Sequence, residues 1–291
     1  MIARSRDPGP APARAIERRP RLEVPPAARV RRRGRGVSRY AGALECRRML
    51  RPRSVSIALA LVVGLAALSS AVGCNRAPRS HTRTAAEAPP AMRYLALGDS
   101  YTIGESVPDL ERWPTQLVHE LREQGVAIED AEIVARTGWT TDELAAGIKA
   151  ATPSGRFALV SLLIGVNNQY RDRPLDEYRT QFVDLLHQAI GFAGGDSSHV
   201  VVLSIPDWGV TPYAAGRDRA KIGAEIDRFN AVNREETQRA GARYVDVTPV
   251  SRTAAHDSTL VAGDGLHPSA RLYALWAKAA LPAALEAVGS P

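Results

Sequence analysis

Short apolar runs alternate with segments of helical periodicity over residues 91–291. Five of the runs are rich in aliphatic and β-branched residues, which is typical of strands. The expected strands are Tyr94–Leu97, Glu132–Ala135, Phe157–Ile164, Val200–Ile205 and Tyr244–Val247. Two of the runs, FALVSLLIG and HVVVLSI, are continuously apolar, as expected for strands that are covered on both faces.

Helices are expected between the strands. The clearest covers 174–190, where apolar residues recur at helical offsets and predict one buried face. A second is expected over 218–239, and a third from about Pro268 into the 280s, with Trp276 in the core. Strand followed by helix, repeated along the chain, predicts an α/β domain in which helices cover both faces of a parallel five-stranded sheet.

Length and composition agree with a folded domain of this kind. The chain has 291 residues, of which 45% are hydrophobic and 24% charged, so wholesale disorder and a polytopic membrane protein are both excluded. Its two cysteines, Cys46 and Cys74, are too few and too close to the N-terminus for a disulfide framework or a zinc cluster in the domain.

The net charge of +7 is unevenly distributed along the chain. Residues 1–90 hold 19 arginines against 5 acidic residues, whereas 91–291 hold 19 basic against 26 acidic residues. The predicted domain is therefore acidic, and its charge gives no reason to expect a nucleic-acid partner.

A targeting signal is predicted at 49–74. Between Arg53 and Arg76 lie 22 uncharged residues, and the order is a basic start, an apolar stretch over 55–68 and then small residues. This order is typical of a secretory signal, so we expect the protein to be exported.

The end of this signal allows two kinds of processing. The sequence Ala71-Val72-Gly73-Cys74 resembles a bacterial lipobox, in which Cys74 would be lipidated and would anchor the protein to a membrane. The same small residues also resemble an ordinary signal-peptidase site, which would release a secreted or periplasmic protein. An uncleaved membrane span is a third possibility, since about 20 apolar residues suffice to cross a bilayer. We expect the lipid-anchored form.

Residues 1–48 fit poorly with a signal peptide, because few signals have so long an Arg- and Pro-rich prelude. We expect translation to begin at or near Met49, or else 1–48 to form a disordered extension. A basic arm for RNA or a membrane surface is the alternative. Residues 75–90 are poor in apolar side chains and are expected to form a flexible linker to the domain at 91–291.

Polar residues and glycines follow the expected strands. Ser100 comes after the first strand, Gly138 after the second and Asn167 after the third. Asp264 and His267 follow the fifth, after a longer loop. Because the carboxyl ends of parallel strands meet at one edge of a sheet, we expect these five residues to converge there.

These residue types suit acyl transfer. A serine hydroxyl needs a base within hydrogen-bond reach and a third group that orients the base, which His267 and Asp264 can supply from a loop whose following helix has Pro268 in its first turn. The reaction also builds negative charge on a carbonyl oxygen. The amides of Ser100 and Gly138 and the side chain of Asn167 are candidate donors to that oxyanion.

The blocks GDS, TG, GVNN and DGLH resemble those of the SGNH hydrolases, also called GDSL esterases and lipases, in order and spacing across essentially all of 91–291. The resemblance implies a three-layer α/β/α flavodoxin-like fold. It also implies Ser100 as nucleophile, a triad with Asp264 and His267, and oxyanion donors at Ser100, Gly138 and Asn167. No metal or organic cofactor is implied.

Three positions depart from familiar patterns. Asn168 stands where the family's third block has Asp, and Arg136 stands where the second block has Asn. Thr102 replaces the last glycine of the Gly-x-Ser-x-Gly nucleophile elbow, which argues against an ordinary α/β-hydrolase.

The sequence as a whole predicts a serine esterase that hydrolyses a small-molecule, lipid or carbohydrate ester through an acyl-enzyme. An esterase for acetylated carbohydrate or cell-wall polymer is the alternative, and a noncatalytic binding protein on the same fold is the alternative from another class. Aromatic residues near the ends of the first, second and fourth strands are candidate substrate contacts: Tyr101, Trp139, Trp208 and Tyr213.

Overall fold

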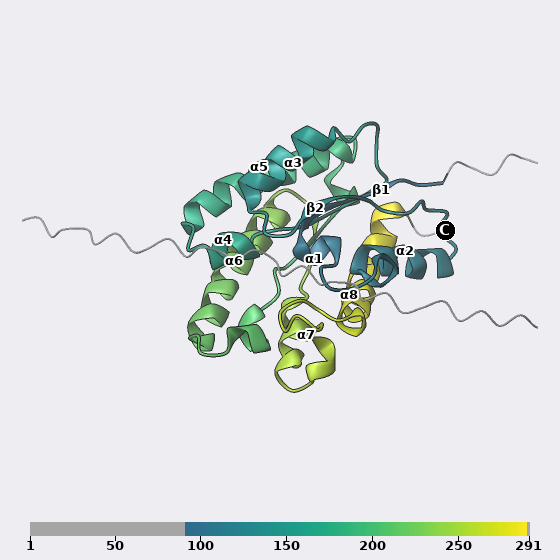
Figure 1. The fold of residues 1–291 in the computed structure, drawn as a ribbon. Helices are drawn as coiled ribbons and strands as arrows, with labels where there is room; N and C mark the ends of the chain where they lie inside the picture. Colours follow the sequence, from purple (N-terminus) through teal and green to yellow (C-terminus); the bar gives the residue numbers. More distant parts are fainter. Residues whose placement is uncertain (1–90, 290–291) are drawn as a thin grey trace, which may run out of the picture. The chain divides into compact units, whose positions relative to one another are not determined.

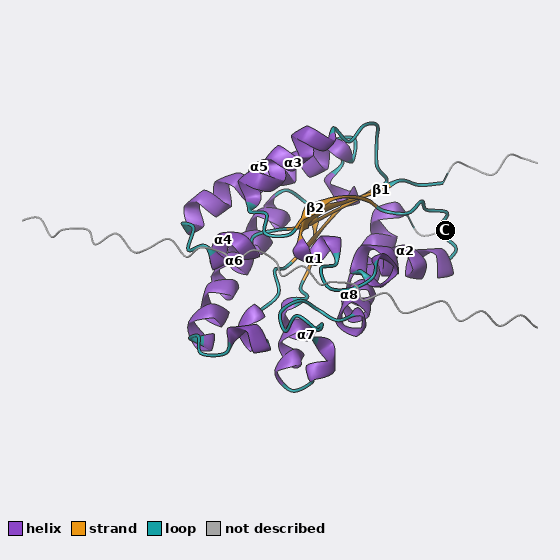
Figure 2. Ribbon diagram, viewed as in Figure 1, coloured by secondary structure: helices purple, strands orange, loops and turns teal. Residues whose placement is uncertain are grey.

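Five parallel strands form the centre of residues 91–289, the part of the chain that the computed structural model describes. The strands are β1 (Tyr94–Asp99), β2 (Glu132–Arg136), β3 (Leu159–Leu163), β4 (Val200–Leu203) and β5 (Arg243–Val245). Their order in the sheet is β2-β1-β3-β4-β5, and every neighbouring pair is parallel. The five expected strands and their parallel arrangement are confirmed. Figure 2 shows the strands lying among the helices.

The strands β4 and β5 each end two residues before the expected position, because side chains form hydrogen bonds with the backbone amides that follow. The amide of Ile205 donates to Oδ1 of Asn230 at 2.8 Å instead of extending β4. The amide of Val247 donates to Oγ of Ser204 at 2.8 Å instead of extending β5. Both segments keep their backbone groups satisfied without a ladder partner.

Helices cover both faces of the sheet, which confirms the expected three layers (Figure 1). One layer holds α2 (Trp113–Glu123) and α8 (Ala270–Val288), which pack on each other. The opposite layer holds α3 (Thr141–Ala151), α5 (Leu175–Phe192) and α6 (Arg219–Arg239). Three short helices begin in loops after strands: α1 (Ser100–Ile103), α4 (Val166–Tyr170) and α7 (Thr248–Arg252).

The predicted helices at 174–190 and 218–239 are confirmed as α5 and α6. The expected position of Pro268 in the first turn of a helix is wrong. Ser269 is the N-cap of α8, and Pro268 lies before it in an antiparallel bridge with Val261. Trp276 of α8 is fully buried, as predicted.

The order of the strands fixes where a site can form. The chain runs from β1 outward to β2 and then returns to place β3 on the other side of β1. In a flavodoxin-like sheet, the loops that leave β1 and β3 in opposite directions open a crevice at the carboxyl ends of these strands. The helices α1 and α4 begin at this point.

The predicted signal, Cys74, the linker and the segment 1–48 lie outside the described residues. Within residues 91–289, no helix combines the length and the apolar character needed to cross a membrane.

Candidate active site

Ser100 is the first residue of α1 and follows β1 directly. Asp99 caps the helix by accepting a hydrogen bond of 3.0 Å from the amide of Tyr101. The turn needs glycine at position 98, because a Cβ there would lie 2.2 Å from Oγ1 of Thr102 and 2.6 Å from the carbonyl oxygen of Leu163. As the first helical residue, Ser100 has an amide without an acceptor inside its own helix, so this N–H can serve a ligand.

Asp264 and His267 form a hydrogen-bonded pair in the loop before α8. Nδ1 of His267 lies 2.6 Å from Oδ2 of Asp264. The other carboxylate oxygen, Oδ1, accepts from the amides of Leu266 at 2.9 Å and His267 at 3.0 Å. This carboxylate fixes the ring so that Nδ1 carries the proton and Nε2 is free to accept one.

Desolvation alone would raise the pKa of the Asp264 carboxyl, but its hydrogen bonds outweigh burial and hold the pKa well below its usual range. The donors are the His267 ring, two amides of the loop and the hydroxyl of Ser106, which lies 2.8 Å from Oδ2. Asp264 therefore stays ionised over the whole neutral range. No sequence pattern indicates Ser106, which lies 158 positions from its partner.

Tyr101 supports the other side of the His267 ring. The two ring centroids lie 5.3 Å apart at an interplanar angle of 57°, and Tyr101 also contacts the ring of Trp276. Both Tyr101 and His267 are buried. The imidazole is held between a carboxylate and an aromatic ring, and little freedom remains for it to rotate.

Asn167 lies in α4, after β3, with its side-chain amide turned toward the end of β1. Its Nδ2 donates to the carbonyl oxygen of Trp139 at 2.9 Å and lies 3.5 Å from Oδ2 of Asp99. A primary amide has two N–H groups. One donates to Trp139, and the other makes the longer bond to Asp99, which a substrate oxygen would have to replace.

Gly138 occupies the loop after β2 with a φ of +86°, a conformation that favours glycine. Its carbonyl oxygen accepts a 2.5 Å hydrogen bond from Arg171, and Arg171 in turn pairs with Glu143 of α3. The neighbouring Thr137 donates its hydroxyl to Glu105. These contacts, which the sequence analysis did not find, hold the Gly138 loop beside the other groups.

A cavity of about 170 Å³ brings the predicted residues together. Its lining includes Ser100, Gly138, Asn167 and His267, and among the expected substrate contacts Tyr101, Trp208 and Tyr213. The other lining residues are Thr137, Val166, Tyr170 and Leu266. Trp139 is not among them, because its ring packs over Gly147 of α3, and only its carbonyl faces the site, through Asn167.

Ser100 and His267 line the same cavity, but within residues 91–289 no hydrogen bond joins the Ser100 hydroxyl to the His267 ring. Catalytic hydrogen bonds are often long before a substrate binds and tighten in the complex. The arrangement can deliver a serine oxygen, a base and three N–H donors to one carbonyl group.

Asp99 is a second ionisable group at the site. Burial raises the pKa of its carboxyl to about 7, against the opposing effect of the hydrogen bond from the Tyr101 amide. The side chain is fully buried, and its Oδ2 faces Asn167. Near neutral pH this carboxyl therefore exists in both protonation states, unlike Asp264.

Asn168, which departs from the expected Asp, is fully buried and ties α4 to α3. Its Oδ1 accepts from the amide of Thr141 at 3.1 Å, and its Nδ2 donates to the hydroxyl of Thr141 at 2.7 Å. This pair of bonds uses both the acceptor and the donor of an amide side chain, so the departure is compatible with the local structure.

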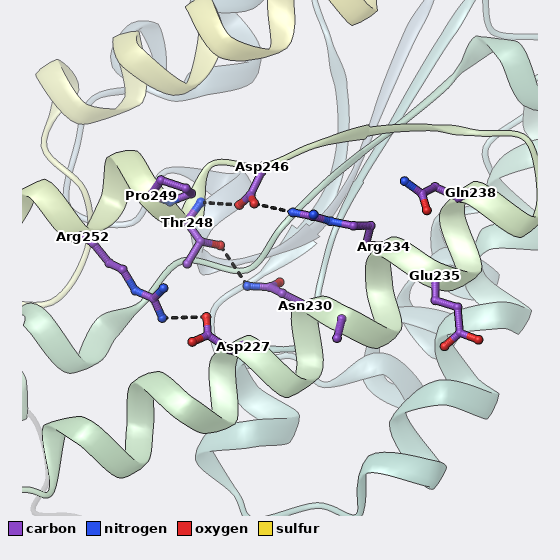
Figure 3. A pocket seen from close by; sticks show the side chains of 10 residues that line it. Asp227, Asn230, Arg234, Glu235, Gln238, Asp246, Thr248, Pro249 and Arg252 are labelled. Carbon is purple, nitrogen blue, oxygen red and sulfur yellow. Dashed lines mark hydrogen bonds and ion pairs between the residues drawn. The ribbon is translucent and has the colours of Figure 1, made fainter.

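A larger hollow of about 460 Å³ lies between α6 and the segment from β5 to α7 (Figure 3). The charges within it are paired: Arg252 with Asp227 at 2.8 Å, and Arg234 with Asp246 at 2.6 Å. Arg252 also reaches the buried carboxylate of Asp207 at 2.8 Å, one residue before Trp208. The hollow shares no lining residue with the cavity. The two are linked through the ion pair between Arg252 and Asp207, which precedes Trp208.

The fold and this set of side chains define a hydrolase of the three-layer α/β/α class. Residues 96–275 match the GDSL-like lipase/acylhydrolase family, and the chain belongs to that family. As a member of it, the protein is an ester hydrolase. A comparison with curated proteins finds no match.

Several solved structures share the fold. A lipolytic G-D-S-L family protein from Veillonella parvula has 18% identity and a TM-score of 0.51, covering 66% of this chain and 97% of its own. TesA has 17% identity and a TM-score of 0.52, with the same coverage. A mutant of Axe2, an acetyl-xylooligosaccharide esterase from Geobacillus stearothermophilus, has 18% identity and a TM-score of 0.50, covering 69% and 95%.

Proposed function

We propose that the protein is a serine esterase that cleaves carboxylic esters through an acyl-enzyme. Ser100 Oγ attacks the ester carbon while Nε2 of His267 takes its proton. The bond to the alcohol then breaks, and His267 returns the proton to the leaving alcohol. Water repeats the cycle on the acyl-enzyme and releases the acid and free Ser100. The observation that carries this proposal is the Asp264–His267 pair at 2.6 Å, in the same cavity as Ser100.

The charge that develops on the carbonyl oxygen is assigned to three donors. These are the amides of Ser100 and Gly138 and the Nδ2 group of Asn167, and all three residues line the cavity. Donors fixed before the reaction stabilise the transition state without reorganisation, and each typically contributes about 3–4 kcal/mol. Asp264 stays ionised and stabilises the imidazolium that forms during attack.

The test uses the full chain and two serine variants. Ser100→Ala is expected to abolish hydrolysis of p-nitrophenyl acetate and labelling by a fluorophosphonate probe, and to keep the melting temperature of the wild type. Ser154→Ala is the matched control, because the Ser154 hydroxyl makes no hydrogen bond within the described residues. A wild-type protein that neither turns over esters nor reacts with the probe would instead be a noncatalytic binding protein.

The size of the cavity favours short acyl groups. Its 170 Å³ is well below the roughly 300–1,000 Å³ of pockets that enclose drug-sized ligands. In a series of p-nitrophenyl esters, kcat/KM is expected to be highest for acetate or butyrate and to fall steeply by octanoate. A maximum at laurate would instead point to a lipid or lysophospholipid esterase.

A second candidate function is O-acetyl removal from carbohydrate or cell-wall polymer. The short cavity supports it, as do the aromatic rings of Tyr170 and Tyr213, which are 40% and 42% exposed. Partly exposed aromatic rings offer large apolar faces with a polar hydroxyl for a bulky alcohol. Acetate release from acetylated xylan and from O-acetylated peptidoglycan, compared with p-nitrophenyl acetate, would identify this activity.

We also propose that the protein is exported and anchored by a lipid on Cys74. The support is the uncharged segment between Arg53 and Arg76 and the small residues that precede Cys74. Cys74→Ser is expected to move the protein from the membrane fraction to the soluble fraction after expression in bacteria. A tryptic peptide from 1–48 in the native protein would refute translation from Met49.

A further inference from the structure

One arginine side chain lies against a cluster of three aromatic rings beside the cavity. The guanidinium carbon of Arg217 lies 5.3 Å from the ring centroids of Tyr170 and Trp208 and 5.4 Å from that of Tyr213. Distances below about 6 Å mark favourable cation–π contacts. One N–H of Arg217 also donates to the Tyr170 hydroxyl at 3.2 Å, and the hydroxyls of Tyr170 and Tyr213 lie 2.9 Å apart.

The rings that hold Arg217 belong to the wall of the cavity. Tyr170, Trp208 and Tyr213 all line it together with Ser100 and His267. The amide of Tyr213 donates to the carbonyl of Gly265 at 2.9 Å, which fixes Tyr213 to the loop that carries His267. In the proposed mechanism His267 gives its proton to the leaving alcohol, so the alcohol portion of the ester is assigned to this part of the wall.

Arg217 has no counter-ion in the described part of the chain. No carboxylate of residues 91–289 lies within 4.0 Å of its guanidinium, although the region 91–291 is acidic overall. The adjacent carboxylate, Asp218, is used elsewhere, since it caps α6 by accepting from the amide of Lys221 at 2.9 Å. The cation is exposed and lies against aromatic rings, and within residues 91–289 most of its N–H groups have no acceptor.

We infer that Arg217 recognises an anionic group on the alcohol portion of the ester, a phosphate or a carboxylate. A guanidinium binds either group through two parallel N–H···O bonds. The aromatic rings fix the side chain before binding, so little conformational freedom is lost when the anion arrives. This inference rests on the proposed esterase activity of Ser100 and adds the substrate class that its cavity selects.

The experiment measures kcat/KM for four acetate esters on the full-length protein. They are 2-acetoxyethyl phosphate, 3-acetoxypropanoate, the neutral 3,3-dimethylbutyl acetate and the cationic acetylcholine. Each variant is compared with the wild type on the same ester, so differences in leaving-group reactivity cancel.

Arg217→Gln is expected to lower kcat/KM for the phosphate or the carboxylate ester by about tenfold to a hundredfold more than for the neutral ester. Arg217→Lys keeps the charge but loses the planar fork, and a smaller loss is expected. The anionic ester whose kcat/KM falls more in Arg217→Gln indicates which of the two groups, phosphate or carboxylate, Arg217 recognises. Arg156→Gln, which removes an exposed arginine before β3, is the matched control. It is expected to leave the ratio of variant to wild-type kcat/KM unchanged for all four esters.

An equal loss on all four esters would overturn the inference, because Arg217 would then only support the wall. A selective gain on acetylcholine in Arg217→Gln would also overturn it, since the rings would then be a site for a cation. Fluorophosphonate labelling of Ser100 is measured in parallel. If the wild type is not labelled, it is the proposed esterase that fails, and this result is distinguishable from a labelled enzyme without anion preference.

Discussion

The hydroxyl of Ser106 donates a hydrogen bond of 2.8 Å to Oδ2 of Asp264, the same oxygen that binds Nδ1 of His267. Ser106 reaches this position with a φ of +67°, a left-handed backbone conformation that glycine adopts readily and other residues adopt only with strain. The adjacent Glu105 accepts from Thr137, which precedes Gly138. One short loop after α1 therefore contacts both Asp264 and the Gly138 loop.

Two substitutions at Ser106 separate positioning from backbone strain. Ser106→Gly and Ser106→Ala both remove the hydroxyl, so both are expected to lower kcat/KM by about threefold to tenfold. Only glycine relieves the left-handed strain, so Ser106→Gly is expected to be more stable than Ser106→Ala by about 1 kcal/mol. Urea unfolding and steady-state kinetics on the two variants measure the two effects independently.

Ser154→Ala serves again as the control for a serine without a hydrogen-bonded hydroxyl. If Ser106→Gly were as fast as the wild type, the hydroxyl would have no positioning role. If glycine and alanine gave equal stability, the positive φ at 106 would be without energetic consequence.

The neighbouring residues Asn167 and Asn168 are expected to affect different quantities. Asn167→Ala removes a candidate oxyanion donor, and kcat is expected to fall about a hundredfold to a thousandfold with little change in stability. Asn168→Ala leaves the amide of Thr141 without its buried acceptor, and the free energy of unfolding is expected to drop by about 1–3 kcal/mol.

Kinetics of p-nitrophenyl acetate hydrolysis and urea unfolding distinguish the two variants. Asn168→Asp provides a conservative comparison, because a carboxylate can still accept from the Thr141 amide. A large rate loss in Asn168→Ala at unchanged stability would contradict the assignment of Asn168 to structure and Asn167 to catalysis.

Asp99 makes stability depend on pH in a defined window. Its pKa is about 7 in the folded protein, against an ordinary value of about 3.9 in the unfolded chain. Between pH 4 and 7 the folded state binds more protons than the unfolded chain. The contribution of Asp99 to the free energy of unfolding is therefore fully present below pH 4 and is lost as the pH rises through 7. Asp99→Asn keeps an acceptor for the Tyr101 amide and removes this dependence.

The expected result is that Asp99→Asn gains stability relative to the wild type from pH 4.5 to pH 8, by an amount on the order of a few kcal/mol. Urea unfolding at pH 4.5, 6 and 8 measures the difference. Asp264 does not affect this difference, because its pKa is lowered in the folded protein. Its contribution to stability is lost only at a pH below this window. Parallel pH curves for wild type and variant would contradict the raised pKa.

Gly98 is required for steric reasons at the turn that presents Ser100. In Gly98→Ala the new Cβ would meet the backbone oxygen of Leu163, which no side-chain rotation can remove. We expect a loss of several kcal/mol in the free energy of unfolding. Gly191→Ala, at a helical position with open space around it, is the control and is expected to gain up to about 1 kcal/mol. Thermal melting compares the two variants.

The sheet could be predicted because its strands are short runs rich in aliphatic and β-branched residues, two of them continuously apolar. The long helices α5 and α6 could be predicted because their apolar positions repeat over several turns. The helices α2 and α3 were expected from the alternation of strand and helix but without bounds, because 11 residues repeat the apolar pattern too briefly to place their ends. Strand ends could not be placed correctly either, because the side chains of Asn230 and Ser204, not the apolar run, decide where β4 and β5 stop.

The candidate site was predictable as far as it follows strand ends. Ser100, Gly138, Asn167 and His267 converge on one cavity because a parallel sheet gathers its carboxyl ends at one edge. Contacts that depend on tertiary packing had no sequence signal. The exposed Ser106 is one example, and the ring of Trp139, which turns to α3 and away from the cavity, is another.

The backbone ladder between β1 and β3 pairs Gly98 with Leu163, so Ser100 and Asn167 each follow the same rung by a few residues. Their separation is set by main-chain pairing, which side-chain replacement leaves intact. Deleting or inserting one residue in either strand would shift the frame by about 3.3 Å and turn every following side chain to the opposite face. Substitutions that fit the backbone can therefore change the side chains of this centre, with Gly98 as an exception, whereas changes of length are expected only in the connections outside these two strands.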